Sequence, residues 1–247
     1  YAHMIKKLLL SALCLLLSLG TVIAAHAEDN TDKRLQGLIT QVSEGYFLMQ
    51  DETLGEVRVN LDDALTVYDG IAAKDTLAPG QYVLVSYNGV MTRSLPPQVT
   101  ALSVGCYVLR GIVTEILDNG CIVEGDSVVQ KAIIHLGDGF PPVYLGVPVT
   151  VYYGGVMALS MPPQISALHV VVPSLFGTAT GVSDSGFTLT TPDGSAYTVS
   201  VDSATRFSIL PAEGQALRVY YNGTVEMDTK VTALEVASFA PAQVATP

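Results

Sequence analysis

The chain has no tryptophan, few histidines and few basic residues. Its 247 residues include four His, and 12 Lys and Arg stand against 23 Asp and Glu. Phosphate backbones are bound by clusters of Lys and Arg, so the acidic excess predicts that nucleic acid is not a partner. Without tryptophan, any stacking on a sugar ring would rest on tyrosine or phenylalanine alone. These absences therefore disfavour nucleic-acid and sugar binding as functions.

Histidine, cysteine and acidic residues also lack the spacings of a metal site. No Cys-x-x-Cys, His-x-x-x-His or D-x-[DN]-x-[DN]-G pattern occurs in the chain. Asp62, Asp63 and Asp69 are expected to face water, with calcium binding by these carboxylates as the alternative. His169 alternates with residues expected to face a core, so it is expected to point to solvent. We therefore expect no metal and no cofactor.

Two cysteines, Cys106 and Cys121, lie outside the N-terminal apolar segment. A secreted protein permits a disulfide between them. Asn119-Gly120 predicts a hairpin turn, which places Cys121 near Leu117 and far along the strand from Cys106. At about 3.3 Å per residue, that gap exceeds the Cα separation of under about 7 Å that a disulfide needs. Free thiols are therefore expected.

The N-terminal segment has the order of a secretory signal peptide, residues 1–27. Lys6 and Lys7 precede an apolar run, and the small residues of Ala-His-Ala end just before Glu28. This order predicts cleavage before Glu28, with an uncleaved membrane anchor as the alternative. Residues 1–3, before Met4, are expected to be an added or over-extended start. The signal peptide is the chain's one expected contact with a membrane.

The chain repeats one unit three times. Each unit opens on a glycine followed by an apolar pattern, as in GLITQV, GIVTEI and GTATGV, at Gly37, Gly111 and Gly177. The closing strings QYVLVSYNGVMTRSLPPQVTALSV, VPVTVYYGGVMALSMPPQISALHV and QALRVYYNGTVEMDTKVTALEV align as well. A fixed period of this kind indicates repeated structural units. We divide the chain into unit 1 (28–105), unit 2 (106–172), unit 3 (173–240) and a disordered tail (241–247).

Each unit is predicted to be a β structure. Val83, Val85 and Tyr87 alternate with their neighbours at a period of two, the pattern of a half-buried strand. Turn dipeptides such as Asn119-Gly120 separate the apolar runs, and one short helix or turn fits at 70–77. About five strands per unit, with a glycine-opened first strand, predict a small closed barrel of the OB type. The expected fold is all-β, with three tandem OB-like five-stranded barrels after the signal peptide.

The repeated motifs carry a resemblance. The pattern G-x-[VI]-x-x-[VI], turn glycine, strand, V-D and then G-x-x-[VL]-x-V-x-Y resembles OB-like barrel domains of unknown function in secreted bacterial proteins. The segment MT-x-S-x-PPQ is similar to one that recurs in secreted or surface proteins of Gram-positive bacteria. The resemblance covers nearly all of the chain after the signal peptide, and unit 3 departs from it by losing both prolines. It implies the OB-like fold and an extracellular or envelope location.

No catalytic motif is expected. The string GVSDSG at 181–186 is not the G-x-S-x-G of a serine nucleophile, and the equivalent strings in the other units are turns. A serine nucleophile needs a nearby base, and unit 3 contains no histidine. An active site would make one unit polar and unique, whereas these units differ mainly by the loss of a loop. The chain is therefore predicted not to be an enzyme, with a metal-dependent or hydrolytic extracellular enzyme as the alternative.

Tyrosines end the fourth predicted strand of every unit. Tyr87, Tyr153 and Tyr221 share the phase of the apolar residues and are expected to cap the barrel cores. Tyr152 and Tyr220 have the opposite phase. They are therefore the better candidates for an exposed aromatic contact with a ligand.

The connection between the fourth and fifth strands is the main candidate binding element. Proline fixes φ, lacks an N–H and holds the preceding residue extended, so LPPQ and MPPQ predict stiff lead-ins to the last strand. In OB folds this connection is one of the ligand-facing loops. The candidate binding residues in these loops, 88–98 and 154–164, are Met91, Leu95, Pro96, Pro97, Gln98, Met157, Met161, Pro162, Pro163 and Gln164.

Three interpretations of these loops remain open. The methionines fold back and plug the mouth of their own barrel, or each loop packs against the next unit, or the loops form a docking surface for an outside partner. The second interpretation agrees with the loss of the loop from unit 3, the last of the three. It also agrees with size, because a barrel of some 66 residues buries only about 60% of its surface and is marginal alone.

The sequence therefore predicts a secreted, non-catalytic binding or spacer module that acts at the bacterial cell envelope. The expected partners are a cell-wall polymer or an envelope protein, together with packing of one repeat against the next. A purely structural stalk is the alternative.

Overall fold

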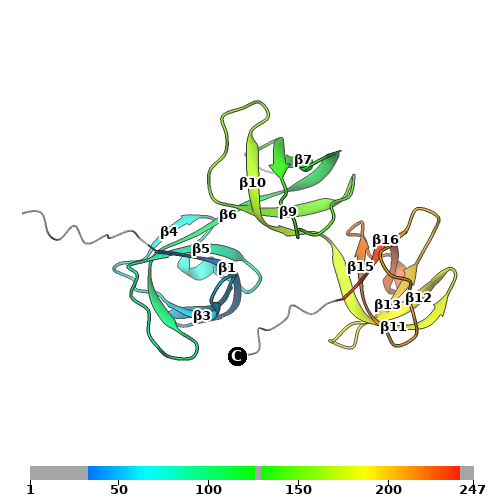
Figure 1. Cartoon of the computed structure of the whole chain (residues 1–247), viewed down its shortest axis with the longest axis horizontal. Coiled ribbons are helices and arrows are strands. Elements are labelled where there is room, and N and C mark those ends of the chain that lie inside the picture. Colours follow the sequence, from blue (N-terminus) through cyan, green and yellow to red (C-terminus); the bar gives the residue numbers. More distant parts are fainter. Residues whose placement is uncertain (1–32, 126–128, 240–247) are drawn as a thin grey trace, which may run out of the picture.

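The computed structural model describes residues 33–125 and 129–239. Within these ranges the chain is almost entirely β-strand, with two short 3-10 helices, η1 (Lys74–Thr76) and η2 (Met227–Thr229). The strands form three groups that follow one another along the chain (Figure 1). The all-β prediction is confirmed, and η1 falls inside the segment 70–77 where a short helix or turn was expected. The predicted signal peptide and the tail 241–247 lie outside the described residues.

Unit 1 is built from a closed ring of strand pairings. The ring strands are β1 (Lys33–Ser43), β2 (Tyr46–Asp51), β3 (Gly55–Asn60), β5 (Tyr82–Tyr87) and the first half of β6 (Gln98–Leu117). The pairings run β1–β2–β3–β6–β5 and return to β1. The pairing of β3 with β6 is parallel and the others are antiparallel. A further short strand, β4 (Val67–Gly70), lies parallel to β6 beyond β3.

Units 2 and 3 repeat this connectivity. In unit 2 the ring strands are the second half of β6, β7 (Gly120–Gly125), β8 (Ala132–His135), β9 (Pro148–Tyr153) and β10 (Gln164–Val171). In unit 3 they are β11 (Ser174–Ser183), β12 (Gly186–Thr190), β13 (Ala196–Ser200), β15 (Ala216–Tyr221) and β16 (Lys230–Ser238), with β14 (Arg206–Phe207) beside β16. In each unit the third and last ring strands pair in parallel.

The three units are joined with little connecting chain. β6 is one continuous strand of 20 residues that belongs to the rings of units 1 and 2, so the predicted boundary between 105 and 106 lies inside it. Only Val172 and Pro173 separate β10 from β11. Short, regular connections of this kind restrict how far neighbouring units can move relative to one another.

Each ring encloses an apolar cluster supplied by the alternating residues of its strands. Val57 and Val59 of β3 are fully buried, and Glu56 and Arg58, which alternate with them, face outward. The same alternation places Leu189 and Val219 inside unit 3. Burying a side chain of this size contributes about 1.5–3 kcal/mol, so these clusters are the main stabilising element of each unit.

The glycine that opens each unit has a steric cause. Gly37, Gly111 and Gly177 lie in the first ring strand, where the second strand crosses closely. A Cβ at these positions would collide with the carbonyl oxygens of the second strand, at Gln50, Glu124 and Thr190 respectively. A residue without a side chain is therefore needed at this crossing in every unit.

Cys106 and Cys121 are both buried and form no disulfide with each other. Cys121 lies in β7 within the core of unit 2. Burial raises the pKa of both thiols to about 11. Both residues therefore serve as core side chains with little tendency to ionise.

Within the described residues, no helix is long and apolar enough to cross a membrane.

Candidate functional site

An aromatic cluster joins unit 1 to unit 2. His169 of β10 stacks on Tyr82 of β5, and Tyr152 of β9 lies against both rings, with centroids 6.0–6.3 Å away. The hydroxyl of Tyr82 donates a hydrogen bond to Glu52, with an O–O distance of 2.5 Å. Burial, and then this hydrogen bond, raise the pKa of Tyr82. Burial lowers the pKa of His169, while the charge of Glu52 opposes that shift.

A second cluster joins unit 2 to unit 3. Unit 3 contributes to it the same face that unit 2 contributes to the first cluster. Tyr220 of β15 lies 6.1 Å from the ring of Tyr144, and the hydroxyl of Tyr144 donates to Glu235 of β16 at 3.0 Å. Burial and then Glu235 raise the pKa of Tyr144. Leu234 of unit 3 packs against the apolar cluster of unit 2, as Leu168 of unit 2 packs against that of unit 1.

The residues that make these contacts are equivalent in the repeat. Tyr152 corresponds to Tyr220, and His169 corresponds to Glu235. In unit 1 the corresponding residues are Ser86 and Ser103, whose hydroxyls are 2.6 Å apart. Within residues 33–125 and 129–239, the side-chain hydrogen bond of these two serines joins them to each other and not to another unit. Tyrosine thus occupies the first of these positions in units 2 and 3, each of which follows another unit, and serine occupies both positions in unit 1.

Two predictions about exposure are wrong for this reason. Tyr152 was expected to be exposed, but only 6% of it is accessible, and Tyr220 is half-buried. His169 was expected to point to solvent, but it is half-buried under Tyr82. All three do point away from the core of their own unit, and the preceding unit covers that face. The tyrosines expected to cap their own cores do so: Tyr87 is buried in unit 1, and Tyr153 and Tyr221 pack against their own clusters.

The proline loops fold back onto their own units. Met91 and Met157 pack against the apolar clusters of units 1 and 2 respectively. This favours the interpretation in which the methionines plug the mouth of their own barrel over packing against the next unit. The carbonyl oxygens of Pro97 and Pro163 accept backbone hydrogen bonds from β3 and β8, at 2.9 Å in both loops. The second proline of each pair is therefore an anchoring point of the loop.

The repeated serine before each proline pair stabilises the same loop. Ser94 Oγ donates to the carbonyl oxygen of Pro96 at 2.8 Å, and Ser160 Oγ donates to that of Pro162 at 2.7 Å. The side chain of Gln164 also contacts His135 of β8, at 2.8 Å between Oε1 and Nε2. Part of the repeated string SxPPQ is therefore explained by hydrogen bonds within each unit.

The tips of these loops are apolar and exposed. Leu95 is 97% accessible and Met161 fully accessible, and the neighbouring exposed apolar residues are Val90, Val156 and Leu159. The two loops do not form one surface, because 88–98 extends from the lower side of unit 1 and 154–164 from the upper side of unit 2 in Figure 1. Four predicted residues, Met157, Met161, Pro162 and Pro163, line a shared cavity of about 460 Å³ with Lys131. The predicted site is therefore two separate apolar tips.

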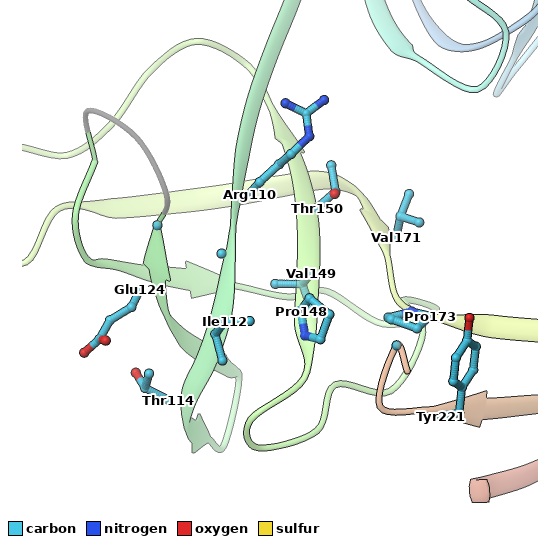
Figure 2. A pocket seen from close by; sticks show the side chains of 13 residues that line it. Arg110, Ile112, Thr114, Glu124, Pro148, Val149, Thr150, Val171, Pro173 and Tyr221 are labelled. Atoms are coloured by element: carbon cyan, nitrogen blue, oxygen red, sulfur yellow. The ribbon is translucent and has the colours of Figure 1, made fainter. Parts of the chain in front are cut away.

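A wider groove runs along the outside of unit 2 and reaches Pro173, Tyr221 and Gly223 of unit 3 (Figure 2). It has a volume of about 920 Å³. Arg110 and Glu124 are its charged residues, and Tyr221 closes its unit 3 end. None of the predicted binding residues lines this groove. Alternation marks Arg110 only as an outward-facing residue of a strand, so the sequence contained no specific signal for it.

No group of three or more His, Cys, Asp or Glu in residues 33–125 and 129–239 is placed to hold a metal ion. Asp62 Oδ1 accepts a hydrogen bond from the backbone N–H of Ala64, and the backbone N–H of Asp62 donates to Thr66 Oγ1 in the same turn. Asp63 forms an ion pair with Lys74 at 2.5 Å, and Asp69 accepts from the hydroxyl of Tyr107. The three acidic residues considered for calcium thus have separate protein partners.

No family model matches the chain, and no curated protein matches it. Among solved structures, one similar chain is a multidomain protein with nucleic acid binding domains from Streptococcus pneumoniae. It is 16% identical, with a TM-score of 0.21 over 85% of this chain and 73% of that chain. Another is Drosophila Unr CSD456, 12% identical, with a TM-score of 0.19 over 84% of this chain and 98% of that chain. At these TM-scores neither similarity carries an argument about this chain's function.

The prediction that nucleic acid is not a partner is nevertheless corrected. It rested on the net charge of the whole chain alone. Net charge averages over all three units and does not describe the surface of any one of them. Nucleic acid is therefore no longer excluded.

Proposed function

We propose that each ring is a small OB-like five-stranded barrel, and that the three barrels form a secreted, non-catalytic binding and spacer module at the bacterial cell envelope. The ring connectivity supports the first part. In each unit, strands one to three form a meander, the first strand pairs with the fourth, and the third pairs in parallel with the fifth. A five-stranded barrel with these connections is of the OB type.

The observation that carries the spacer function is the repeated contact between units. Tyr152 and His169 of unit 2, and Tyr220 and Glu235 of unit 3, occupy equivalent positions and each pack against the preceding unit. A single barrel of this size is marginally stable, so a covered face stabilises it. Residues repeated for contact between neighbours are what a serial array of barrels requires.

The exposed loop tips support the binding function. Leu95 and Met161 lie at the ends of loops whose bases are fixed by hydrogen bonds to Pro97 and Pro163. A stiff loop loses little entropy on binding, and an exposed apolar side chain at its tip gains burial. We infer that each tip contacts an envelope partner independently, because the two tips point to different sides of the molecule (Figure 1).

Co-sedimentation with cell-wall fractions and small-angle scattering test the two parts separately. The protein would comprise residues 28–247, beside a Leu95→Ser, Met161→Ser variant and a variant with Tyr82→Ala and Tyr144→Ala. We expect the tip variant to stay in the supernatant with an unchanged scattering curve, and the interface variant to broaden the distance distribution. A single-stranded oligonucleotide is included as a further ligand.

Three outcomes would contradict the proposal. Equal pelleting of the wild type and the tip variant would exclude the loop tips as binding elements. If the wild type pelleted with no fraction and kept one fixed shape, the protein would be a purely structural stalk. Tight binding of the oligonucleotide alone would replace the envelope partner by a nucleic acid.

A further inference from the structure

A further cavity lies between units 2 and 3 and shares Val171 with the groove of Figure 2. Its volume is about 440 Å³. Unit 2 contributes an apolar wall made by Phe140, Pro141 and Pro142, and unit 3 contributes Arg218 and Tyr220. Ser174 and His169 lie on the chain that connects the two walls. The cavity thus combines one cation, neutral polar groups and an apolar surface.

Arg218 is held in a fixed orientation at this cavity. Its guanidinium donates a hydrogen bond to Ser174 Oγ at 3.0 Å. Its central carbon lies 5.9 Å from the ring of Phe176 and 5.4 Å from that of Phe239, and these two rings stack on each other 4.9 Å apart. Contact with aromatic faces orients a planar guanidinium and leaves its in-plane N–H groups free to donate.

Arg218 has no carboxylate partner in the described part of the chain. The one ion pair found in residues 33–125 and 129–239 joins Lys74 to Asp63 in unit 1. A guanidinium has five N–H donors, and the recorded hydrogen bond to Ser174 uses one of them. In a chain with a net charge of −11, an oriented arginine without an acidic partner at a cavity is a recognition group for an anion.

The remaining polar groups limit the charge of that anion. Burial lowers the pKa of His169, so the imidazole is neutral near pH 7. Burial raises the pKa of Tyr220, which keeps its hydroxyl protonated. Glu235 lies on the strand beside Tyr220 but accepts hydrogen bonds from Tyr144 and Ser208, and it does not line the cavity. One positive charge therefore lines the cavity, and the nearby Glu235 lies on the strand next to Tyr220.

We propose that this cavity binds a small organic monocarboxylate, with the carboxylate on Arg218 and the carbon skeleton against Phe140, Pro141 and Pro142. A planar carboxylate matches the two parallel N–H donors of a guanidinium. A doubly charged phosphate would leave one charge uncompensated near Glu235, and it offers no carbon skeleton to the apolar wall. This site is distinct from the loop tips and does not depend on the envelope function proposed above.

Chemical-shift titration of the ¹⁵N-labelled chain 28–247 tests the site. The probes are sodium benzoate, benzyl alcohol as its neutral counterpart, inorganic phosphate and polygalacturonate. We expect saturable chemical-shift changes with benzoate at the amides around Ser174 and Arg218. Benzyl alcohol and phosphate are expected to bind there at least tenfold more weakly. Polygalacturonate distinguishes the source, because shifts with the polymer and not with benzoate assign the site to a polymer-borne carboxylate.

The variants are Arg218→Gln and Arg218→Lys, with Arg58→Gln as the matched control. Arg58 also lies over an aromatic ring, 3.7 Å from the centroid of Tyr46, but it lines none of the cavities described above. We expect Arg218→Gln to weaken carboxylate binding at least tenfold, Arg218→Lys to weaken it less, and Arg58→Gln to leave it unchanged. If Arg218→Gln lowers the melting temperature, carboxylate binding by Arg218→Lys is compared with the wild type instead, because lysine keeps the positive charge.

Equal shifts with benzyl alcohol or phosphate would overturn the proposal, and so would equal losses in the Arg218 and Arg58 variants. The absence of saturable shifts with either carboxylate probe would overturn it as well.

Discussion

The imidazole of His169 stacks on the ring of Tyr82, with centroids 5.4 Å apart and planes inclined by 6°. The two residues come from different repeats and are 87 positions apart in the chain. Tyr82 is 4% accessible, and its hydroxyl donates to Glu52. This contact therefore couples the stability of unit 1 to the presence of unit 2.

Replacing Tyr82 by alanine is expected to destabilise the chain by about 2–4 kcal/mol, because a buried aromatic ring and its contacts with two other rings are lost. The matched control is Tyr46→Ala. Tyr46 also lies in unit 1, but its recorded contact is with Arg58 of the same unit. Urea unfolding followed by circular dichroism measures both. Equal destabilisation by the two substitutions would show that the contact between units adds nothing.

Acidification is expected to weaken the same contact. Burial lowers the pKa of His169, so the folded chain binds a proton there less readily than the unfolded chain. Stability from this residue is fully present above the unfolded pKa of about 6.5 and decreases as the pH falls toward the lower folded value. The free energy of unfolding should therefore be smaller at pH 5 than at pH 7, beyond the change caused by the carboxylates.

His169→Gln isolates this contribution, since it removes the titrating group and leaves the acidic residues in place. The variant should show a smaller difference in the urea midpoint between pH 5 and pH 7 than the wild type. His135→Gln, at an exposed position of β8, serves as the control. An unchanged pH dependence in His169→Gln would mean that the stack tolerates the imidazolium.

Gly111→Ala is expected to cost about 1–3 kcal/mol or more, because its Cβ would meet the carbonyl oxygen of Glu124 in the paired strand. Gly154→Ala is the control, since no atom lies within 4 Å of the Cβ it would add. The control should stay within about 0.5 kcal/mol of the wild type. Thermal melting of both variants measures the two losses of stability. A small loss in Gly111→Ala would show that β6 and β7 can separate at this crossing.

The sequence predicted the interior of each unit better than its outside. Alternation identified the buried valines of β5, because a strand with one buried face requires apolar residues at a period of two. The same alternation marks Tyr152 and His169 as outward, and it does not distinguish water from a neighbouring unit. The register shift between Ala167 and His169 further changes which residues face that neighbour. Contacts between units depend on both surfaces, and the sequence of one does not specify them.

The sequence predicted some of the candidate binding residues and missed others. The proline strings are visible in the sequence because they repeat, and the structure places Leu95 and Met161 at exposed tips. Arg218 has no repeat signal, since its equivalents are Leu84 and Thr150. Its significance arises from Phe176, Phe239 and Ser174, which meet only after β11, β15 and the end of β16 have paired.

The two methionines of one proline loop should differ in their contribution to stability. Met157 packs against the cluster of unit 2, so Met157→Ser is expected to cost about 1–3 kcal/mol. Met161 is fully accessible, and Met161→Ser should stay within about 0.5 kcal/mol of the wild type. Urea denaturation compares them directly. A large loss in Met161→Ser would indicate that the tip packs against another part of the chain rather than facing a partner.

The two buried thiols are expected to be unreactive until the chain unfolds. Burial raises the pKa of Cys106 and Cys121 to about 11, and only the thiolate attacks a disulfide reagent. At pH 8 the folded chain 28–247 should release almost no thionitrobenzoate from Ellman's reagent within minutes, and two equivalents after addition of guanidinium chloride. Because Cys106 lies in β6 where units 1 and 2 meet, a Tyr82→Ala variant should expose the thiol of Cys106 before that of Cys121. Simultaneous labelling of both thiols in that variant would indicate that the two units unfold together.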